Sequence, residues 1–190
     1  MCMKLGTIVD AAIKWVTETT PTKLPEEWYS TTRDIFQVRL QSFLSHTQKH
    51  IGEDVYLLTA IVGEIGNNSF DHNLGNWRDV PGVFFADDRK KKVVVLADRG
   101  QGIRQTISRV MPEIKDDQEA LKVAFTRVLS GRQPERRGNG LKFVVQVLKK
   151  HQWSLKFQSG SGELSIKSGT SIQIRKSIIQ IYGCLAILYY

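Results

Sequence analysis

The sequence LTAIVGEIGNNSFDHN at residues 58–73 carries the clearest helical pattern in the chain. At about 100° per residue, its apolar side chains fall on one stripe, and Glu64, Asn68 and Asp71 fall on a polar stripe beside it. A carboxylate and an amide held one turn apart can accept a proton and ligate a hard cation such as Mg²⁺. The stretch taken alone favours a simpler interpretation, in which its Asn and Asp residues mark a frayed helix end and a loop.

The overall composition is that of one ordinary globular domain. The chain has 190 residues, of which 41% are hydrophobic and 24% are charged. A chain of this size and composition can bury a single core without disulfides or metals. Its net charge of +8 favours polyanionic partners, a class that includes nucleotides as well as nucleic acids.

The cysteines and the two ends of the chain bear on its compartment. Only Cys2 and Cys184 occur, so we expect no disulfide framework and a reducing, cytoplasmic setting. Residues 1–15 lack the apolar core and cleavage site of a signal peptide. The apolar residues 178–190 are too short for a membrane span of about 20 residues, and their composition predicts a buried strand. We therefore expect no membrane partner.

The spacing of apolar residues predicts helices early in the chain and most strands late. Helices are expected over residues 8–17, from an N-cap at 30–32 through residue 44 to an end at Gly52, from 53 to 68, and over 106–110, 118–129 and 138–148. Strands are expected over residues 83–85, 92–96, 153–158, 163–167, 171–175 and 178–190. This order favours an α+β fold, with residues 1–50 as a helical segment that packs on a domain of residues 51–190.

A first glycine motif, Asp98-Arg99-Gly100-Gln101-Gly102, directly follows an apolar strand. Ligand sites of α/β sheets tend to lie at such strand ends. The Asp could accept a hydrogen bond from an exocyclic amine such as adenine N6, and the glycines would let the backbone approach a flat ring. The alternative is a β-turn that uses Asp and Gly for its conformation alone.

A second glycine motif, Gly138-Asn139-Gly140-Leu141, opens a strongly apolar helix. Free N–H groups and the helix dipole favour phosphate at such a position. The neighbouring Arg136, Arg137 and Lys142 add positive charge. The alternative is a glycine hinge that enters a core helix, because a lone GxG pattern is weak evidence for a phosphate site.

Taken in order, these three segments resemble the ATP-binding domain of the GHKL superfamily (gyrases, Hsp90 chaperones, histidine kinases and MutL), known as the Bergerat fold. Residues 64–68 resemble its N box, residues 98–103 its first glycine box, and residues 137–141 its second. Within the superfamily, Glu64 followed by Asn68, Ser69 and His72 is most similar to the serine kinases of the anti-sigma-factor group. The resemblance covers roughly residues 54–190.

The chain departs from the family pattern at two places. Ser69 replaces the usual Ala of the N box. The final Gly-Thr motif corresponds either to Gly169-Thr170 or to Gly183-Cys184, and the second choice would remove a hydroxyl near the adenine. The resemblance also leaves the roles of Asp71 and His72 open. No phosphoacceptor histidine motif precedes the domain, which argues against autophosphorylation on histidine.

The resemblance implies a role for each matching residue. Asn68 would ligate Mg²⁺, and Glu64 would be the general base that activates water or a protein hydroxyl. Asp98 would bind the adenine. The other nucleotide contacts would come from Gly100, Gly102, Ile103, Arg137, Gly138, Asn139, Gly140, Leu141 and Lys142. Residues 105–136 would form a lid that closes over ATP.

The implied fold is a two-layer α/β sandwich, with a mixed, mostly antiparallel sheet and helices on one face. The implied function of residues 51–190 is that of a histidine-kinase-like ATP-binding domain, in the form of a serine-kinase-like signalling domain that uses Mg-ATP on a protein partner. An ATP-hydrolysing conformational switch is the alternative. The basic charge motivates a third hypothesis, a nucleic-acid-binding module, but no helix-turn-helix or RNA-binding motif supports it. Whether the chain forms a homodimer stays open.

Overall fold

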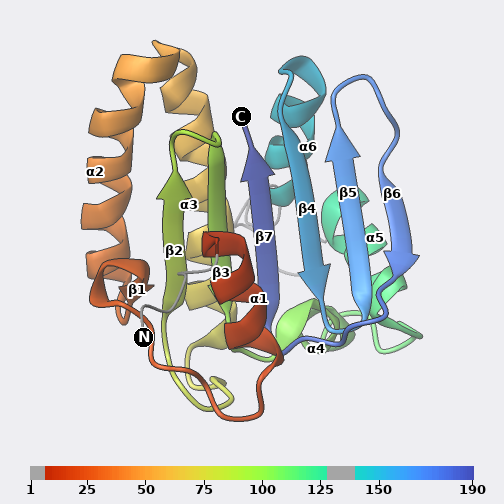
Figure 1. Cartoon of the computed structure of the whole chain (residues 1–190). Coiled ribbons are helices and arrows are strands. Elements are labelled where there is room, and N and C mark those ends of the chain that lie inside the picture. Colours follow the sequence, from red (N-terminus) through yellow and green to blue (C-terminus); the bar gives the residue numbers. More distant parts are fainter. Residues whose placement is uncertain (1–6, 128–139) are drawn as a thin grey trace, which may run out of the picture.

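A seven-stranded sheet forms the frame of the fold in the computed structural model, which describes residues 7–127 and 140–190 (Figure 1). The strand order is β1-β2-β3-β7-β4-β5-β6, and every pair of neighbours in it is antiparallel. The bounds are β1 (Tyr29–Ser30), β2 (Val83–Asp88), β3 (Val93–Asp98), β4 (Ser154–Ser159), β5 (Gly162–Lys167), β6 (Gln173–Lys176) and β7 (Cys184–Tyr189). The predicted α+β class is confirmed, and the sheet contains no parallel pair among the described strands.

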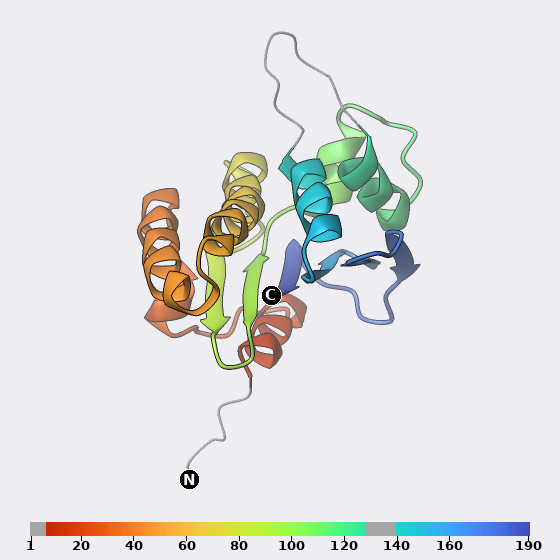
Figure 2. The ribbon, with the colours of Figure 1, turned by 90° about the horizontal axis from the view of Figure 1, so that it is seen from above.

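Helices cover one face of this sheet, as Figure 2 shows from above. They are α2 (Arg33–Ile51), α3 (Asp54–Asn73), α4 (Gly102–Ser108), α5 (Asp117–Thr126) and α6 (Gly140–Lys150). The apolar stripe of α3 faces inward, with Leu58, Ile61 and Val62 fully buried in the main core between helices and sheet. The two layers predicted from the sequence are therefore present.

Helix α1 (Ile8–Thr17) packs on the opposite face, so the central strands are covered on both sides (Figure 2). Its Trp15 and Val16 are buried in a second apolar cluster with residues such as Phe84 and Val95. Strand β3, which reads VVVLAD, is buried along its whole length. A continuous run of β-branched and other apolar residues suits a strand that has a layer on each face. The helix thus adds to the expected single helical layer.

The predicted elements occur where the sequence places them, but several of their bounds differ. Helix α3 runs to Asn73 instead of residue 68, and strand β2 runs to Asp88 instead of residue 85. Helix α4 begins at Gly102, inside the first glycine motif, and not at residue 106. Strand β7 begins at Cys184, so the prediction of a strand over residues 178–183 is wrong. Ile178 is fully exposed, and the backbone at Gly183 has a φ of +69°, which interrupts an extended strand. The apolar composition of residues 178–190 gave no sign of the turn that precedes β7.

The short elements complete the fold around the sheet. The 3-10 helix η1 (Glu26–Trp28) leads into β1, which pairs with the edge of β2. Within residues 7–127 and 140–190, no helix combines the length and apolarity needed to cross a bilayer.

Candidate functional site

One pocket is lined by residues from all three sequence motifs. It lies between α3, the last residues of β3, the first residues of β7, and the first residues of α4 and α6. Its lining residues are Ile65, Asn68, Ser69, His72, Asn73, Leu96, Ala97, Asp98, Gly102, Ile103, Thr106, Leu141, Phe157, Cys184 and Ala186. Five of them are predicted site residues, namely Asn68, Asp98, Gly102, Ile103 and Leu141. Segments far apart in the sequence therefore meet at one place.

Asp98 is the buried polar centre of this pocket. Its side chain lies at the end of β3, and the residue is only 1% exposed. The Ser69 hydroxyl donates to Oδ2 at 2.7 Å, the Asn73 amide donates to Oδ1 at 3.2 Å, and the Gly100 N–H donates to Oδ1 at 2.9 Å. Burial raises the pKa of Asp98, and these donors oppose that rise by stabilising the charged form. The carboxylate is thus held in one orientation and, as a lining group, can accept a ligand N–H.

Ser69 and Asn73 were not identified as site residues from the sequence. They lie one helical turn apart on α3, so both reach the same neighbour, and this i, i+4 spacing was the available signal. The Asn73 side chain also accepts a hydrogen bond from the N–H of Gln101 at 3.0 Å. A Cβ atom at Gly100 would lie 2.0 Å from the Asn73 side chain, so the close approach of helix and loop requires glycine there. Asn73 therefore ties α3 to the first glycine motif.

Glu64 lies beside the first residue of α6. Its side chain is exposed, and a Cβ atom at Gly140 would lie 2.1 Å from its Oε2 atom. Helix α3 and the described start of the second glycine motif are consequently in contact. The partly exposed Lys142 follows on α6, and desolvation lowers the pKa of its ammonium group.

The rest of the second glycine motif is outside the described residues. This applies to Arg136, Arg137, Gly138 and Asn139, whose predicted contacts with phosphate stay predictions. It also applies to residues 128–136 of the predicted lid. The described part of the lid contains most of α4 and the whole of α5.

The structure separates the two residues whose roles the sequence left open. Asp71 forms an ion pair with Arg33 of α2 and does not line the pocket. His72 does line the pocket, and burial lowers the pKa of its imidazole. Its backbone carbonyl accepts a hydrogen bond from the side chain of Gln101. The polar stripe of α3 is therefore divided between the pocket and a contact with its neighbouring helix.

The sequence left two candidates for the last motif, Gly169-Thr170 and Gly183-Cys184, and they occupy different places in the structure. Cys184 lies opposite Asp98 in the pairing of β3 with β7 and lines the pocket. Thr170 lies in the turn between β5 and β6, where its hydroxyl donates to the carbonyl of Lys167 at 3.0 Å. Gly183-Cys184 is thus the pair at the pocket. Burial raises the pKa of the Cys184 thiol, so this group is neutral at physiological pH.

Ser159 at the end of β4 is a further residue that sequence reasoning missed. Its hydroxyl accepts a hydrogen bond from the N–H of Ile103 at 2.9 Å and donates to the carbonyl of Gly183 at 3.1 Å. It therefore links the first glycine motif to the turn before β7. No motif in the sequence marks it.

The polar groups of the site could bind a metal ion only together with further ligands from a bound molecule. Within the described ranges, no group of three His, Cys, Asp or Glu residues is placed to hold a metal ion. Asn68 lines the pocket and has a carboxamide oxygen, a hard ligand of the kind that Mg²⁺ accepts, and protein-bound Mg²⁺ usually takes further ligands from substrate phosphates and water. Asn68 therefore fits a Mg²⁺ ion bound through phosphate oxygens.

The pocket itself is narrow. Its volume of about 30 Å³ holds only one or two water molecules. A planar heterocycle would enter only if side chains from α4 and α6 moved apart. The apolar walls, from Ile65 on α3 to Phe157 on β4, would then contact its faces.

Comparisons with known proteins give solved structures only. No family model and no curated protein matches the sequence. The ATPase region of Saccharomyces cerevisiae topoisomerase II is similar with a TM-score of 0.43 and 12% identity, over 68% of this chain and 36% of that one. The 43K ATPase domain of Thermus thermophilus gyrase B, in complex with an aminocoumarin, is similar with a TM-score of 0.43 and 16% identity. This match covers 80% of this chain and 40% of that one. The chain spans well under half the length of either structure.

Proposed function

We propose that this chain is an ATP-binding domain of the GHKL type, which binds Mg-ATP in the pocket around Asp98. The observation that carries the proposal is a buried carboxylate at a strand end, held by Ser69 and Asn73 and bordering a mostly apolar pocket. Burying a carboxylate is costly, and a ligand amine that hydrogen-bonds to it would offset part of that cost. The order of the three sequence motifs supports the same conclusion.

In this proposal adenine is recognised mainly by Asp98. Its carboxylate accepts a hydrogen bond from the exocyclic N6 amine, and apolar side chains such as Ile65 and Phe157 contact the ring. Cys184 occupies the position where the family motif has a Thr, whose hydroxyl would lie near the adenine. A neutral thiol is only a weak hydrogen-bonding group, so it replaces that hydroxyl poorly. Specificity for the base therefore depends on one carboxylate.

The phosphates are assigned to the other end of the pocket. From the sequence resemblance, Gly138, Asn139 and Gly140 would contact them through the backbone, and Arg137 and Lys142 would contribute positive charge. Asn68 supplies an oxygen ligand for Mg²⁺, and that ion when bound neutralises charge on the phosphate oxygens. Gly100, Gly102, Ile103 and Leu141 complete the nucleotide contacts.

Glu64 is assigned the role of general base. Its exposed carboxylate lies at the start of α6, next to the proposed phosphate site, and is open to an incoming hydroxyl group. It would remove the proton as that oxygen attacks the γ-phosphorus, while the bond from this phosphorus to the bridging oxygen breaks and ADP leaves. The hydroxyl belongs either to a serine of a protein partner, which makes the domain a serine-kinase-like regulator, or to water, which makes it an ATP-driven switch.

A competition titration tests the proposal. A fluorescent ATP analogue with Mg²⁺ should bind the chain, and unlabelled ATP should displace it. GTP should compete more than about 100-fold less well, because its base has a carbonyl where adenine has the amine and would leave Asp98 without a donor. Failure of the analogue to bind, or equal competition by GTP, would show that the pocket is not an adenine site.

A labelled γ-phosphate distinguishes the two chemistries. After incubation with the chain and a co-encoded protein, label on that protein indicates a kinase, and free labelled phosphate indicates an ATPase. The same measurement on Glu64→Ala shows whether either activity belongs to this site.

A further inference from the structure

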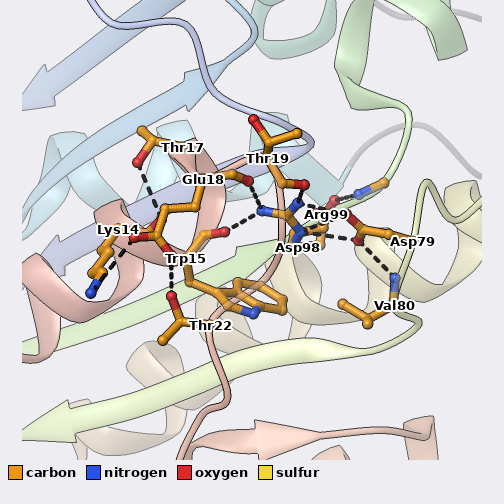
Figure 3. Close-up of polar contacts among 11 residues, drawn as sticks. Lys14, Trp15, Thr17, Glu18, Thr19, Thr22, Asp79, Val80, Asp98 and Arg99 are labelled. Carbon is orange, nitrogen blue, oxygen red and sulfur yellow. Dashed lines mark hydrogen bonds and ion pairs between the residues drawn. The ribbon is translucent and has the colours of Figure 1, made fainter.

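Arg99 is a fully buried cation that the proposed function does not use. It follows Asp98 in the first glycine motif, but successive residues at a strand end point to opposite faces. Asp98 therefore borders the pocket, whereas Arg99 points toward α1 on the other side of the sheet. Figure 3 shows its guanidinium group between the end of α1 and Asp79. Its side chain is 0% exposed.

All five N–H donors of this guanidinium have acceptors. Nε contacts both carboxylate oxygens of Asp79 at 3.0 Å, and Nη2 contacts Oδ2 of the same residue at 2.5 Å. Nη1 donates to the carbonyls of Trp15 and Glu18, the latter at 2.9 Å, and Nη2 donates to the carbonyl of Thr19 at 3.2 Å. A guanidinium has five such donors in a fixed geometry. The site is therefore built for arginine.

These contacts join three segments of the chain. The three carbonyls are at the C-terminal end of α1, where backbone acceptors lack partners and the helix dipole is negative. Asp79 belongs to the loop that follows α3, the helix that carries Asn68 and Ser69. Burial raises the pKa of the Asp79 carboxyl, but its hydrogen bonds with Arg99 and Val80 outweigh this and bring the pKa below its usual range.

Aromatic contacts add to the rigidity of this cluster. The Arg99 guanidinium lies 5.9 Å from the ring centre of Trp15 and 5.3 Å from that of Tyr182. Tyr182 donates its backbone N–H to the carbonyl of Val16 at 2.8 Å. The turn that leads into β7, and so to Cys184 in the pocket, is thereby attached to the same end of α1.

We propose that Arg99 is a positioning residue that couples the nucleotide pocket to the end of α1 on the opposite face of the sheet. The inference rests on the proposed function. A base enters the narrow pocket only if α4 and α6 move apart, and α4 begins at Gly102, three residues after Arg99, so a shift of α4 acts on Arg99 and through its contacts on α1. Coupling between two sites is reciprocal, so nucleotide should order the end of α1, and loss of the Arg99 contacts should weaken nucleotide binding.

Hydrogen exchange on the unaltered chain gives the first test. Amides of residues 14–22 should exchange at least about threefold more slowly with saturating Mg-ATP than without it, because opening of this segment becomes rarer. Amides of residues 163–175, in the hairpin of β5 and β6, serve as the control and should not change. Unchanged exchange at 14–22 with nucleotide bound, or equal protection of both segments, would overturn the proposal.

Two lysine variants give the second test. Arg99→Lys keeps the charge but cannot reach the three carbonyls and Asp79 together, so the Kd for the fluorescent ATP analogue should rise about tenfold or more. Arg175→Lys is the matched control, because Arg175 is exposed on β6 and pairs with Glu163 of β5 at 2.6 Å, away from the pocket and from the contacts of Arg99. Its Kd should stay within about twofold of the unaltered chain.

The outcomes separate this inference from the proposed function. A folded Arg99→Lys protein that binds nucleotide as tightly as the unaltered chain would refute the coupling while leaving the nucleotide site intact. If that variant does not fold, as judged by circular dichroism, the exchange experiment decides alone. An unaltered chain that binds no nucleotide would overturn the proposed function, and the coupling with it.

Discussion

Replacing Asp98 with Asn tests the pocket with little disturbance of the fold. Asn has nearly the same shape, and its Oδ1 atom can still accept from Asn73 and Gly100. Its Nδ2 atom would take the place of Oδ2 and donate to the Ser69 hydroxyl, which can accept as well as donate. No buried side-chain partner is orphaned, so we expect the free energy of unfolding at neutral pH to change by less than about 1 kcal/mol.

Nucleotide binding should change much more than stability. The variant replaces an acceptor of the adenine amine with a second donor. A hydrogen bond to a charged group contributes about 1.5–3 kcal/mol, and facing two donors toward each other adds a further cost. A combined loss of about 3 kcal/mol corresponds to a Kd that is roughly 150-fold higher.

The assay is a titration of the fluorescent ATP analogue with Mg²⁺, paired with urea unfolding followed by circular dichroism. Asp88→Asn is the control, because Asp88 lies at the end of β2 farthest from Asp98, where its Oδ1 accepts a hydrogen bond from the Lys91 N–H at 3.1 Å. The control should bind nucleotide like the unaltered chain. A stable Asp98→Asn protein with a Kd within about threefold of the unaltered chain would refute the assignment of Asp98.

Four further predictions concern the rest of the site. Glu64→Ala should lower turnover at least about 100-fold, while the Kd for ATP changes little; an equal loss of binding in the titration would contradict the general-base role. Ser69→Ala removes a donor from buried Asp98 and should lower the free energy of unfolding by about 1–3 kcal/mol, measured in urea. An unchanged free energy of unfolding would contradict the hydrogen bond between Ser69 and Asp98. Gly140→Ala should displace the flexible Glu64 carboxylate, lowering turnover about tenfold with little change in the unfolding midpoint. Burial lowers the pKa of His72 in the folded chain, so its contribution to stability is present above about pH 6.5 and is lost as the pH falls below that value; His72→Gln should flatten this part of the urea-midpoint profile.

Local patterns in the sequence were sufficient to predict most helices and strands and the functional groups that they carry. The apolar spacing of α3 and the run of Val residues in β3 are properties of neighbouring residues, so periodicity was sufficient to predict both. The position of Asp98 at a strand end followed from the same local pattern. The bounds of β7 were less well predicted, because its apolar tail continues through a turn that only the backbone at Gly183 reveals.

Tertiary structure decided which distant side chains meet. Strand β7 is the last in the chain but lies between β3 and β4, and this brings Cys184 opposite Asp98 and leaves Thr170 in a remote turn. Ser69 lies 29 residues before Asp98, and Trp15 lies 84 residues before Arg99. The order of strands in a sheet, and the face that a helix covers, depend on how whole elements bury their apolar surfaces against one another. A pattern of neighbouring residues does not encode that choice, so the partners of Asp98 and Arg99 emerge only in the folded chain.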